Sequence, residues 1–533
     1  MDFSRKENIF CCTILFFYIV TLFFSFLTDG KVVEYYLFSL SDSTDSYMDL
    51  FNSIIETEGL KHANNYPPLA LFFYAVLGFL TPVKNPAMGW NGSVGRILRT
   101  TLEGSVINLF TILIFSFSLF LVIKEFLKNT DFTEVKKTFI ALVILFSGPV
   151  IYTVDRGNIL SFTLVFLLLF FLYKDNENRK LQVFSYFCLA VAANLKYYPA
   201  IFGLLLIKEK KYKDALLCAF FGAFIFGFSL VMFIITTRIH FHESIFRINI
   251  IKEVYYCVKN ALSMSSSQAG NIFAGSSYTS IQNVGNGIVK FIDHFINKEK
   301  SLRLWYVIPS FLGTSFFISL LFSLFLVKEK WISALTISLV CCLCFNSASG
   351  FYSLVYLIVP LLCYLIHSDD IKSVSLLFGI ALSFVAIPIC KDVGNRYYLT
   401  FGYIIPEICL ILLFAYSVRK TFSSFLTENR KKGMKYIILF TGCNLIILFL
   451  FVAKFFYKYQ KSFGIYEGNG TLSSPYKISN KKHLEHLRNI VNNGVSTKGL
   501  YFIQMDDIDL GSDDWVPIGI YGSERYFKFC RAV

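Results

Sequence analysis

The chain has 533 residues, of which 55% are hydrophobic, 18% are aromatic and 16% are charged. Because soluble chains usually carry about a quarter charged residues, this composition excludes an ordinary soluble protein. The formal net charge of +14 suggests a nucleic-acid partner, but the Lys and Arg residues lie in short clusters between apolar runs, which is the positive-inside pattern. The composition therefore predicts an all-α polytopic membrane protein that binds membrane lipids and no nucleic acid.

The N-terminal segment "MDFSRKENIFCCTILFFYIVTLFFSFL" has the outline of a signal peptide. No small-residue cleavage site follows it, so we expect a retained membrane anchor.

Apolar runs separated by basic clusters continue through most of the chain and predict transmembrane helices. They lie near residues 9–28, 69–83, 105–123, 138–154, 158–173, 183–195, 199–207, 214–236, 304–327, 331–346, 351–366, 372–390, 399–417 and 435–453. The positive-inside rule places the loops rich in Lys and Arg in the cytoplasm. These loops are residues 124–137, 174–180, 208–213, 328–330 and 418–434.

This orientation leaves the 69–83 run unable to cross the membrane. The run is short and follows Pro67 and Pro68, which favour extended geometry before them. We therefore expect a re-entrant or interfacial helix within one long external loop, residues 29–104. A second external loop covers 237–303, and about 13 crossings result, with the N-terminus inside and the C-terminus outside.

The chain divides into a membrane domain, residues 1–455, and a polar tail, residues 456–533. In the tail, Ser479 or Asn480 is a candidate N-cap for an amphipathic helix that ends at Gly494. Strand-like segments follow at 500–510 and 515–519, so we expect a small extracytoplasmic α+β appendage. The tail resembles the capping unit of bacterial adhesin repeats, although the repeats themselves are missing.

Three aspartates follow the first apolar run in "DSTDSYMDLFN", residues 42–52. Asp42, Asp45 and Asp49 are spaced three and four residues apart, so a helix would present them on one face. The apolar neighbours of Asp49 are expected to raise the pKa of its carboxyl toward the range of a general base. A solvated loop or a helix N-cap is the alternative interpretation.

Cations stand at the predicted outer ends of two apolar helices, Arg156 in "DRGN" (155–158) and Lys196 in "LKYYP" (195–199). A cation at such a place is a candidate for anion binding, and snorkelling to the interface is the alternative. Asn158 offers a further donor. Arg96 and Arg99, in the first external loop, either extend this anion site or are surface charges.

The segment "HFHE" (240–243) offers two histidines without a nearby third ligand, so we predict no metal site. We also find no phosphate-binding loop and no nucleotide-sugar domain.

Taken together, residues 1–455 resemble the GT-C superfamily of integral-membrane glycosyltransferases. The closest similarity is to the bacterial enzymes of glycosyltransferase family 87 that use polyprenyl-phosphate mannose. The matching segments are "MDLFN" (48–52), "YPPL" (66–69), "DRGN" (155–158), "AANLKYYPAIFGLLLIKEKKYKDA" (192–215) and "FYSLVYLIVPLL" (351–362).

The resemblance implies transfer of a hexose from a lipid-linked phosphate donor to an acceptor hydroxyl at the outer face of the plasma membrane, without a cofactor or metal. It implies that Asp49 is the base, with Asp45 and Asp42 behind it. It also implies that basic groups bind the donor phosphate and that Tyr66, Pro67 and Pro68 shape the pocket floor. The phosphate candidates are Arg156, Lys196, Asn158, Arg96 and Arg99.

Three other classes remain open. A flippase or transporter would share the composition, but we find no internal repeat and few ionisable groups deep in the helices. A polysaccharide polymerase or ligase is more similar and harder to separate. A surface-binding protein would use the tail and leave the many predicted crossings unexplained.

Overall fold

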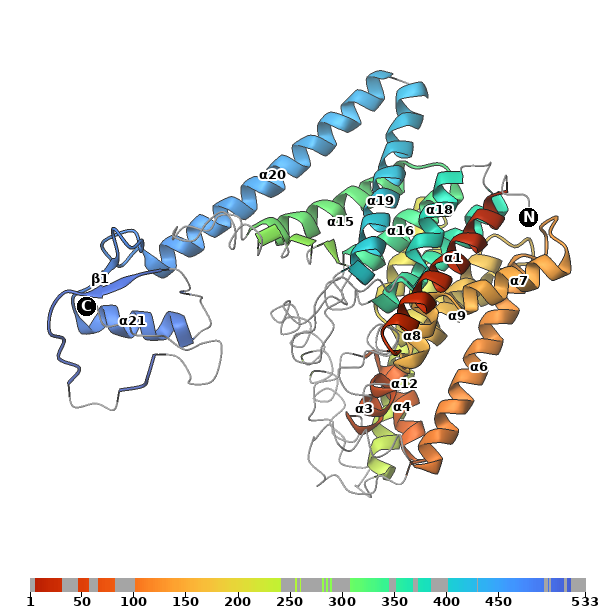
Figure 1. The fold of residues 1–533 in the computed structure, drawn as a ribbon, viewed down its shortest axis with the longest axis horizontal. Coiled ribbons are helices and arrows are strands. Elements are labelled where there is room, and N and C mark those ends of the chain that lie inside the picture. The colour runs from red at the N-terminus through yellow and green to blue at the C-terminus, as the bar shows by residue number, and fades with distance from the viewer. Residues whose placement is uncertain are drawn as a thin grey trace. The chain divides into compact units, whose positions relative to one another are not determined.

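The computed structural model describes residues 5–30, 47–56, 66–81, 101–240, 307–344, 351–367, 372–384, 401–428, 430–492, 500–511 and 515–518, with isolated positions at 255–289 and 497. The described chain is mostly helical, as the composition predicts (Figure 1). It forms two compact units. One comprises Met1–Ile281 and Phe316–Ile437, and the other comprises Gln282–Ser315 and Ile438–Val533.

Most of the helices lie in the predicted apolar runs. The first half of the chain forms α1 (Lys6–Leu27), α3 (Met48–Glu56), α4 (Pro68–Gly78), α6 (Leu102–Phe126), α7 (Glu134–Leu145), α8 (Gly148–Asp155), α9 (Leu160–Tyr173), α10 (Arg179–Leu195), η1 (Tyr198–Gly203), α11 (Leu204–Lys208) and α12 (Tyr212–His240). The second half forms α15 (Ile308–Leu326), α16 (Lys330–Leu343), η5 (Phe351–Leu357), α17 (Ile358–His367), α18 (Lys372–Ala381), α19 (Phe401–Glu428) and α20 (Arg430–Phe463).

The predicted 138–154 crossing is broken into two helices, α7 and α8, that meet at an angle of 53°. Ser147 and Gly148 lie at the break, and Pro149 stands in the first turn of α8, where its missing N–H costs no helical hydrogen bond. Gly148 packs closely on the backbone of Phe384 and donates its N–H to the carbonyl of Leu382. The 138–154 run is therefore helical as predicted, but it is broken near Ser147, and α7 and α8 together remain a candidate for one span.

The predicted 418–434 loop is also mostly helical, because α19 continues to Glu428 and α20 begins at Arg430. Sequence patterning ends a membrane helix where charges begin, but a helix continues into water when its backbone hydrogen bonds remain satisfied.

Five described helices are long and apolar enough to span a membrane, or six if α7 and α8 together form one span. They are Lys6–Leu27, Leu102–Phe126, Tyr212–Thr237, Ile308–Leu326 and Met434–Lys454. Shorter apolar helices account for several other predicted runs. The multi-pass character is thus supported, whereas the count of about 13 crossings stays a prediction.

The helix α4 has 11 residues, which corresponds to about 16 Å of rise, roughly half of a bilayer core. This length fits the expectation that the 69–83 run does not cross. α4 packs on α3, α10 and α12, and the three labelled helices α3, α4 and α12 lie side by side in Figure 1.

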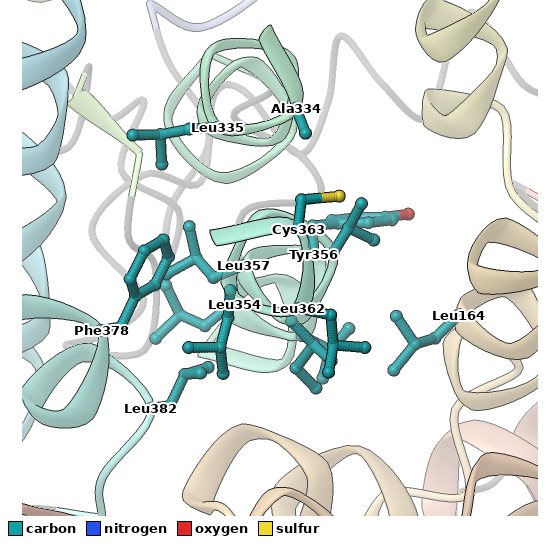
Figure 2. Close-up of a cluster of buried hydrophobic side chains, with 14 of the residues drawn as sticks. Leu164, Ala334, Leu335, Leu354, Tyr356, Leu357, Leu362, Cys363, Phe378 and Leu382 are labelled. Carbon is teal, nitrogen blue, oxygen red and sulfur yellow. The ribbon is translucent and has the colours of Figure 1, made fainter. Parts of the chain in front are cut away.

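The main core of the first unit joins α9, α16, η5, α17 and α18. Figure 2 shows Leu164 of α9 facing Leu362, with Ala334 and Phe378 contributed by neighbouring helices. Leu164 is fully buried. Because α9 is fixed by this core, the residues just before its first turn have a defined position.

The tail contains a parallel two-stranded sheet and one amphipathic helix. β1 (Tyr476–Ile478) pairs with β2 (Phe502–Gln504), and α21 (Lys481–Asn492) connects them. As predicted, Asn480 caps α21, because its Oδ1 accepts the N–H of His483 at 3.0 Å.

Leu487, Ile490 and Val491 of α21 are buried against an aromatic cluster that includes Tyr466 and Tyr476. The strand expected at 515–519 is wrong for its described residues, 515–518, which are not in a strand.

Candidate active site

The short helix α3 is docked on the turn between α8 and α9. The backbone N–H of Tyr47 donates to the carbonyl of Asp155 at 2.6 Å, and that of Asp49 donates to the carbonyl of Arg156 at 3.0 Å. N–H groups in the first turn of a helix have no acceptor within the helix. The turn supplies these acceptors and so sets the position of the segment that carries Asp49.

Gly157 allows this close approach. Its φ of +61° is in the left-handed region that favours glycine, and a Cβ added there would lie 2.7 Å from Cβ of Leu50. The chain therefore turns within "DRGN" (155–158), with Gly157 facing α3.

Asn158 has its amide orientation fixed by α9. Its Oδ1 accepts the N–H of Leu160 at 3.0 Å, which leaves Nδ2 to donate to Oδ2 of Asp49 at 2.8 Å. Asn158 is buried, so both ends of its side chain are satisfied within the protein.

Arg156 forms a two-pronged ion pair with Asp49. Its Nε donates to Oδ2 at 3.1 Å and its Nη2 donates to Oδ1 at 2.6 Å. The exposed fractions of the two side chains are 23% for Arg156 and 18% for Asp49. The planar guanidinium matches a carboxylate in this geometry, so the pair holds Asp49 in one orientation.

Burial would raise the pKa of Asp49, as its buried neighbours Met48, Leu50 and Phe51 led us to expect. The charge of Arg156 and the hydrogen bonds from Arg156 and Asn158 outweigh burial and hold this pKa below its usual value. The prediction of a raised pKa is wrong because it considered apolar neighbours in sequence and not the cation supplied by a distant turn. Asp49 is therefore ionised at neutral pH.

Lys196 lies directly after α10, in extended backbone. Its Nζ is 4.2 Å from the centroid of the Tyr66 ring, a cation–π contact. Burial lowers the pKa of Lys196 to about 8, and the nearby charge of Asp49 opposes this change. The structure therefore brings Lys196 and Asp49 into the same site from α10 and α3.

Tyr66 stands at the start of α4, followed by Pro67 at the N-cap and Pro68 at the first helical position. Its ring meets that of Tyr74 edge to face, with centroids 5.4 Å apart. The two prolines suit a helix start because they lack the N–H that would find no acceptor there. The residues predicted to shape the pocket thus lie next to the charged cluster.

A mostly apolar groove runs beside this cluster. Leu50, Phe73, Phe115 and Phe162 contribute to its wall, and Asn158 adds a polar group. Asn158 therefore faces both the groove and the Asp49 carboxylate.

Four of the predicted site residues lie outside the described residues. They are Asp42, Asp45, Arg96 and Arg99. The side chains of "HFHE" (240–243) are also outside them. Within the described part of the chain, no three His, Cys, Asp or Glu side chains gather as a metal site.

Sequence reasoning missed three contributors to the site. Tyr47 has a φ of +60°, unusual for a residue other than glycine, and its N–H anchors α3. Tyr74 contacts Tyr66 from within α4, and Gly157 admits Leu50. Only Gly157 had a signal in sequence, because a glycine between polar residues is typical of a turn that requires positive φ.

Comparison with protein families gives a match to the model of Glycosyltransferase family 87 over residues 64–345, more than half of the chain. The chain belongs to glycosyltransferase family 87. This family 87 protein is therefore a membrane-embedded glycosyltransferase. Comparisons with curated proteins and with solved structures gave no significant match.

The matched range contains Tyr66, Arg156, Asn158 and Lys196, whereas Asp49 precedes it. The case for Asp49 therefore depends on its contacts with residues inside the matched range.

Proposed function

We propose that this family 87 enzyme transfers a hexose, mannose or a similar sugar, from a polyprenyl-phosphate donor to an acceptor hydroxyl. The acceptor is a glycolipid or a cell-surface polysaccharide at the outer face of the membrane. The observation that supports this most strongly is the Asp49 cluster, which we define as Asp49, Arg156, Asn158 and Lys196. It combines an oriented carboxylate with a cation at one end of α9 and α10.

The proposed reaction needs a base for the acceptor and a cation for the leaving group. The acceptor oxygen attacks the anomeric carbon, and the bond from that carbon to the phosphate oxygen breaks, so that polyprenyl phosphate leaves with the electron pair. Asp49 takes the acceptor proton. Its low pKa keeps it ionised and ready, and the acceptor hydroxyl becomes acidic only as the new bond forms.

Within this proposal, Arg156 and Asn158 orient Asp49, because their observed donors point at its carboxylate. Lys196 stabilises the charge that develops on the departing phosphate. Arg96 and Arg99 remain candidates for the same anion, and Asp45 and Asp42 remain alternative bases. No cofactor or metal is required for this chemistry.

The proposed orientation of the enzyme in the membrane is based on the positive charges at the opposite end of α9. There, Lys174, Lys211 and Lys330, one from each of three basic segments that we assign to the cytoplasm, gather around Asp175. The Asp49 cluster would then face away from the cytoplasm, where a flipped lipid-linked donor is available. We also place the C-terminal tail on that outer side as an accessory unit.

The test is release of polyprenyl phosphate. Purified full-length protein in lipid nanodiscs, given polyprenyl-phosphate mannose and a cell-envelope glycolipid fraction, is expected to release polyprenyl phosphate and to form a mannosylated product. Asp49→Asn is expected to stop both.

Asp214→Asn is the matched control, because Asp214 also pairs with an arginine, Arg179, at 2.6 Å but at the other end of α10. Normal turnover by Asp49→Asn would remove Asp49 from its role. Movement of an intact lipid-linked glycan across the membrane without bond cleavage would favour a flippase instead. Transfer of a whole glycan would favour a polymerase or ligase.

A further inference from the structure

The Lys196 ammonium has an unusual environment for a charged group. Among the described residues the ammonium forms no hydrogen bond and no ion pair, and it makes a cation–π contact with the Tyr66 ring at 4.2 Å. The side chain is only partly exposed. An ammonium carries three N–H donors, so here they are left for an acceptor that the described chain does not supply.

The nearby carboxylate of Asp49 is not the acceptor for the N–H donors of Lys196. A carboxylate has about four acceptor positions, and three hydrogen bonds from Arg156 and Asn158 already occupy Asp49. Asp49 and Lys196 influence each other through charge, yet they do not come within ion-pair distance. A direct pair with Asp49 would use N–H donors of Lys196 that are otherwise left for a substrate.

The Tyr66 ring explains why Lys196 stays where it is. The negative face of an aromatic ring attracts a cation without using any of its N–H donors. Tyr66 directly precedes Pro67 and Pro68 at the start of α4, and its ring makes an edge-to-face contact with Tyr74. The ring therefore fixes the ammonium beside Asp49 while leaving its donors open.

We infer that Tyr66 is a positioning residue whose ring holds Lys196 apart from Asp49, so that the ammonium receives the phosphate group of a prenyl phosphate. This inference rests on the proposed function and adds one role to it. Arg156 orients the carboxylate of Asp49, and Tyr66 positions the ammonium of Lys196. The ring, and not the phenol oxygen, is the part of Tyr66 that matters.

The titratable and charged groups around Lys196 and Tyr66 come from several elements. They are Asp49, Arg156, Tyr74 and Tyr352. Asp49 and Arg156 keep opposite charges over the working pH range and pair with each other, so Lys196 is the group expected to titrate near neutral pH. Loss of the ring removes a stabilising contact from the ammonium and shifts the pKa of Lys196 further down.

The first experiment measures binding of farnesyl phosphate to full-length protein in nanodiscs, with farnesol as the probe that lacks phosphate. Farnesyl phosphate is expected to bind more tightly than farnesol. Tyr66→Leu is expected to weaken farnesyl phosphate binding about tenfold, and Tyr66→Phe, which keeps a ring, is expected to rescue most of the loss. In a Lys196→Gln background, Tyr66→Leu should have little further effect, because the two residues act through one contact.

The second readout is the pH dependence of turnover. The basic limb of the donor kcat/KM profile is expected to move to lower pH in Tyr66→Leu and to return toward its original position in Tyr66→Phe. Equal farnesyl phosphate affinity in Tyr66→Leu and wild type would overturn the inference, as would equal losses in the leucine and phenylalanine variants. If wild type binds farnesyl phosphate in this ring-dependent way but releases no polyprenyl phosphate from a sugar donor, the proposed function fails and the positioning role stands.

Discussion

The two ends of the packed helices α9 and α10 carry charged clusters that differ in how completely their charges are matched. The Asp175 cluster comprises Lys174, Asp175, Glu209, Lys211 and Lys330. In it, Lys174 reaches Glu209 at 2.6 Å, and Lys211 and Lys330 reach Asp175 at 2.7 and 2.9 Å. In the Asp49 cluster, Arg156 is paired, but Lys196 has only the Tyr66 ring among the described residues.

This difference indicates that the Asp175 cluster stabilises the fold and that the Asp49 cluster is suited to bind a ligand. A network in which each cation meets a carboxylate ties helix ends together and leaves little capacity for a ligand. A partly buried cation without an acceptor costs stability, and such a cost is typical of a site that awaits substrate. The comparison therefore predicts that changes in the Asp49 cluster alter turnover, whereas changes in the Asp175 cluster alter stability.

The largest expected effect is that of Asp49→Asn. The amide keeps the shape of the side chain but cannot accept the acceptor proton, so kcat should fall about 10³-fold. Asp214→Asn should stay within about threefold of wild type. Equal losses in the two variants, measured as polyprenyl phosphate release, would show that an ordinary ion pair explains both.

A smaller loss is expected for Lys196→Gln, about 10²-fold in donor kcat/KM, because a positive charge near the leaving phosphate is removed. The wild-type pKa of about 8 means that the ammonium is present below this pH and lost above it. Turnover in wild type should thus fall as pH rises through about 8, and Lys196→Arg should extend the plateau to higher pH. A wild-type profile that stays flat to pH 10 would contradict the assignment.

Gly157→Ala tests the close contact between α3 and the turn that joins α8 to α9. The new methyl group would meet Leu50 and would place a side chain at a φ of +61°. We expect about tenfold lower kcat and about 1 to 3 kcal/mol lower stability, because backbone strain and the contact both act on the segment that carries Asp49. Gly203→Ala is the control, since a Cβ there meets open space. Thermal melting and turnover in nanodiscs measure both effects.

The smallest effect on turnover is expected for Asp175→Asn. The folded-state pKa of Asp175 is lowered by Lys174, Lys211 and Lys330 despite burial, which raises it. A depressed pKa stabilises the fold above the unfolded value of about 4, and this stability is lost as pH falls below it. The variant should lose about 1 kcal/mol at pH 7 and little at acid pH, with kcat unchanged.

The sequence predicted the helical membrane character and several members of the site. Arg156, Asn158 and Lys196 were named from apolar helices that end in polar residues, Asp49 from the aspartate spacing after the first apolar run, and Tyr66 from the family resemblance. They come together in the structure. Local pattern was sufficient for Arg156 and Lys196, because a cation at the end of an apolar helix is a functional candidate.

The partners of these residues were not predictable. The Asp49 and Arg156 pair joins residues 107 positions apart, and no local pattern indicates which cation a carboxylate will meet. The same limit explains the wrong direction of the pKa shift of Asp49. The break between α7 and α8 depends on the close packing of Gly148 against Phe384, which is also a long-range contact.

The most direct test of the central claim is the side of the membrane that each end of α10 faces. Tyr197→Cys places a thiol at an exposed position beside Lys196, and Lys180→Cys places one at the exposed start of α10. With an impermeant maleimide, and with labelling of the parent protein subtracted, the cysteine at 197 should react in intact cells and the one at 180 only after the cells are opened. If the cysteine at 197 reacts only in opened cells, the Asp49 cluster faces the cytoplasm and the proposed outer-face transferase is excluded.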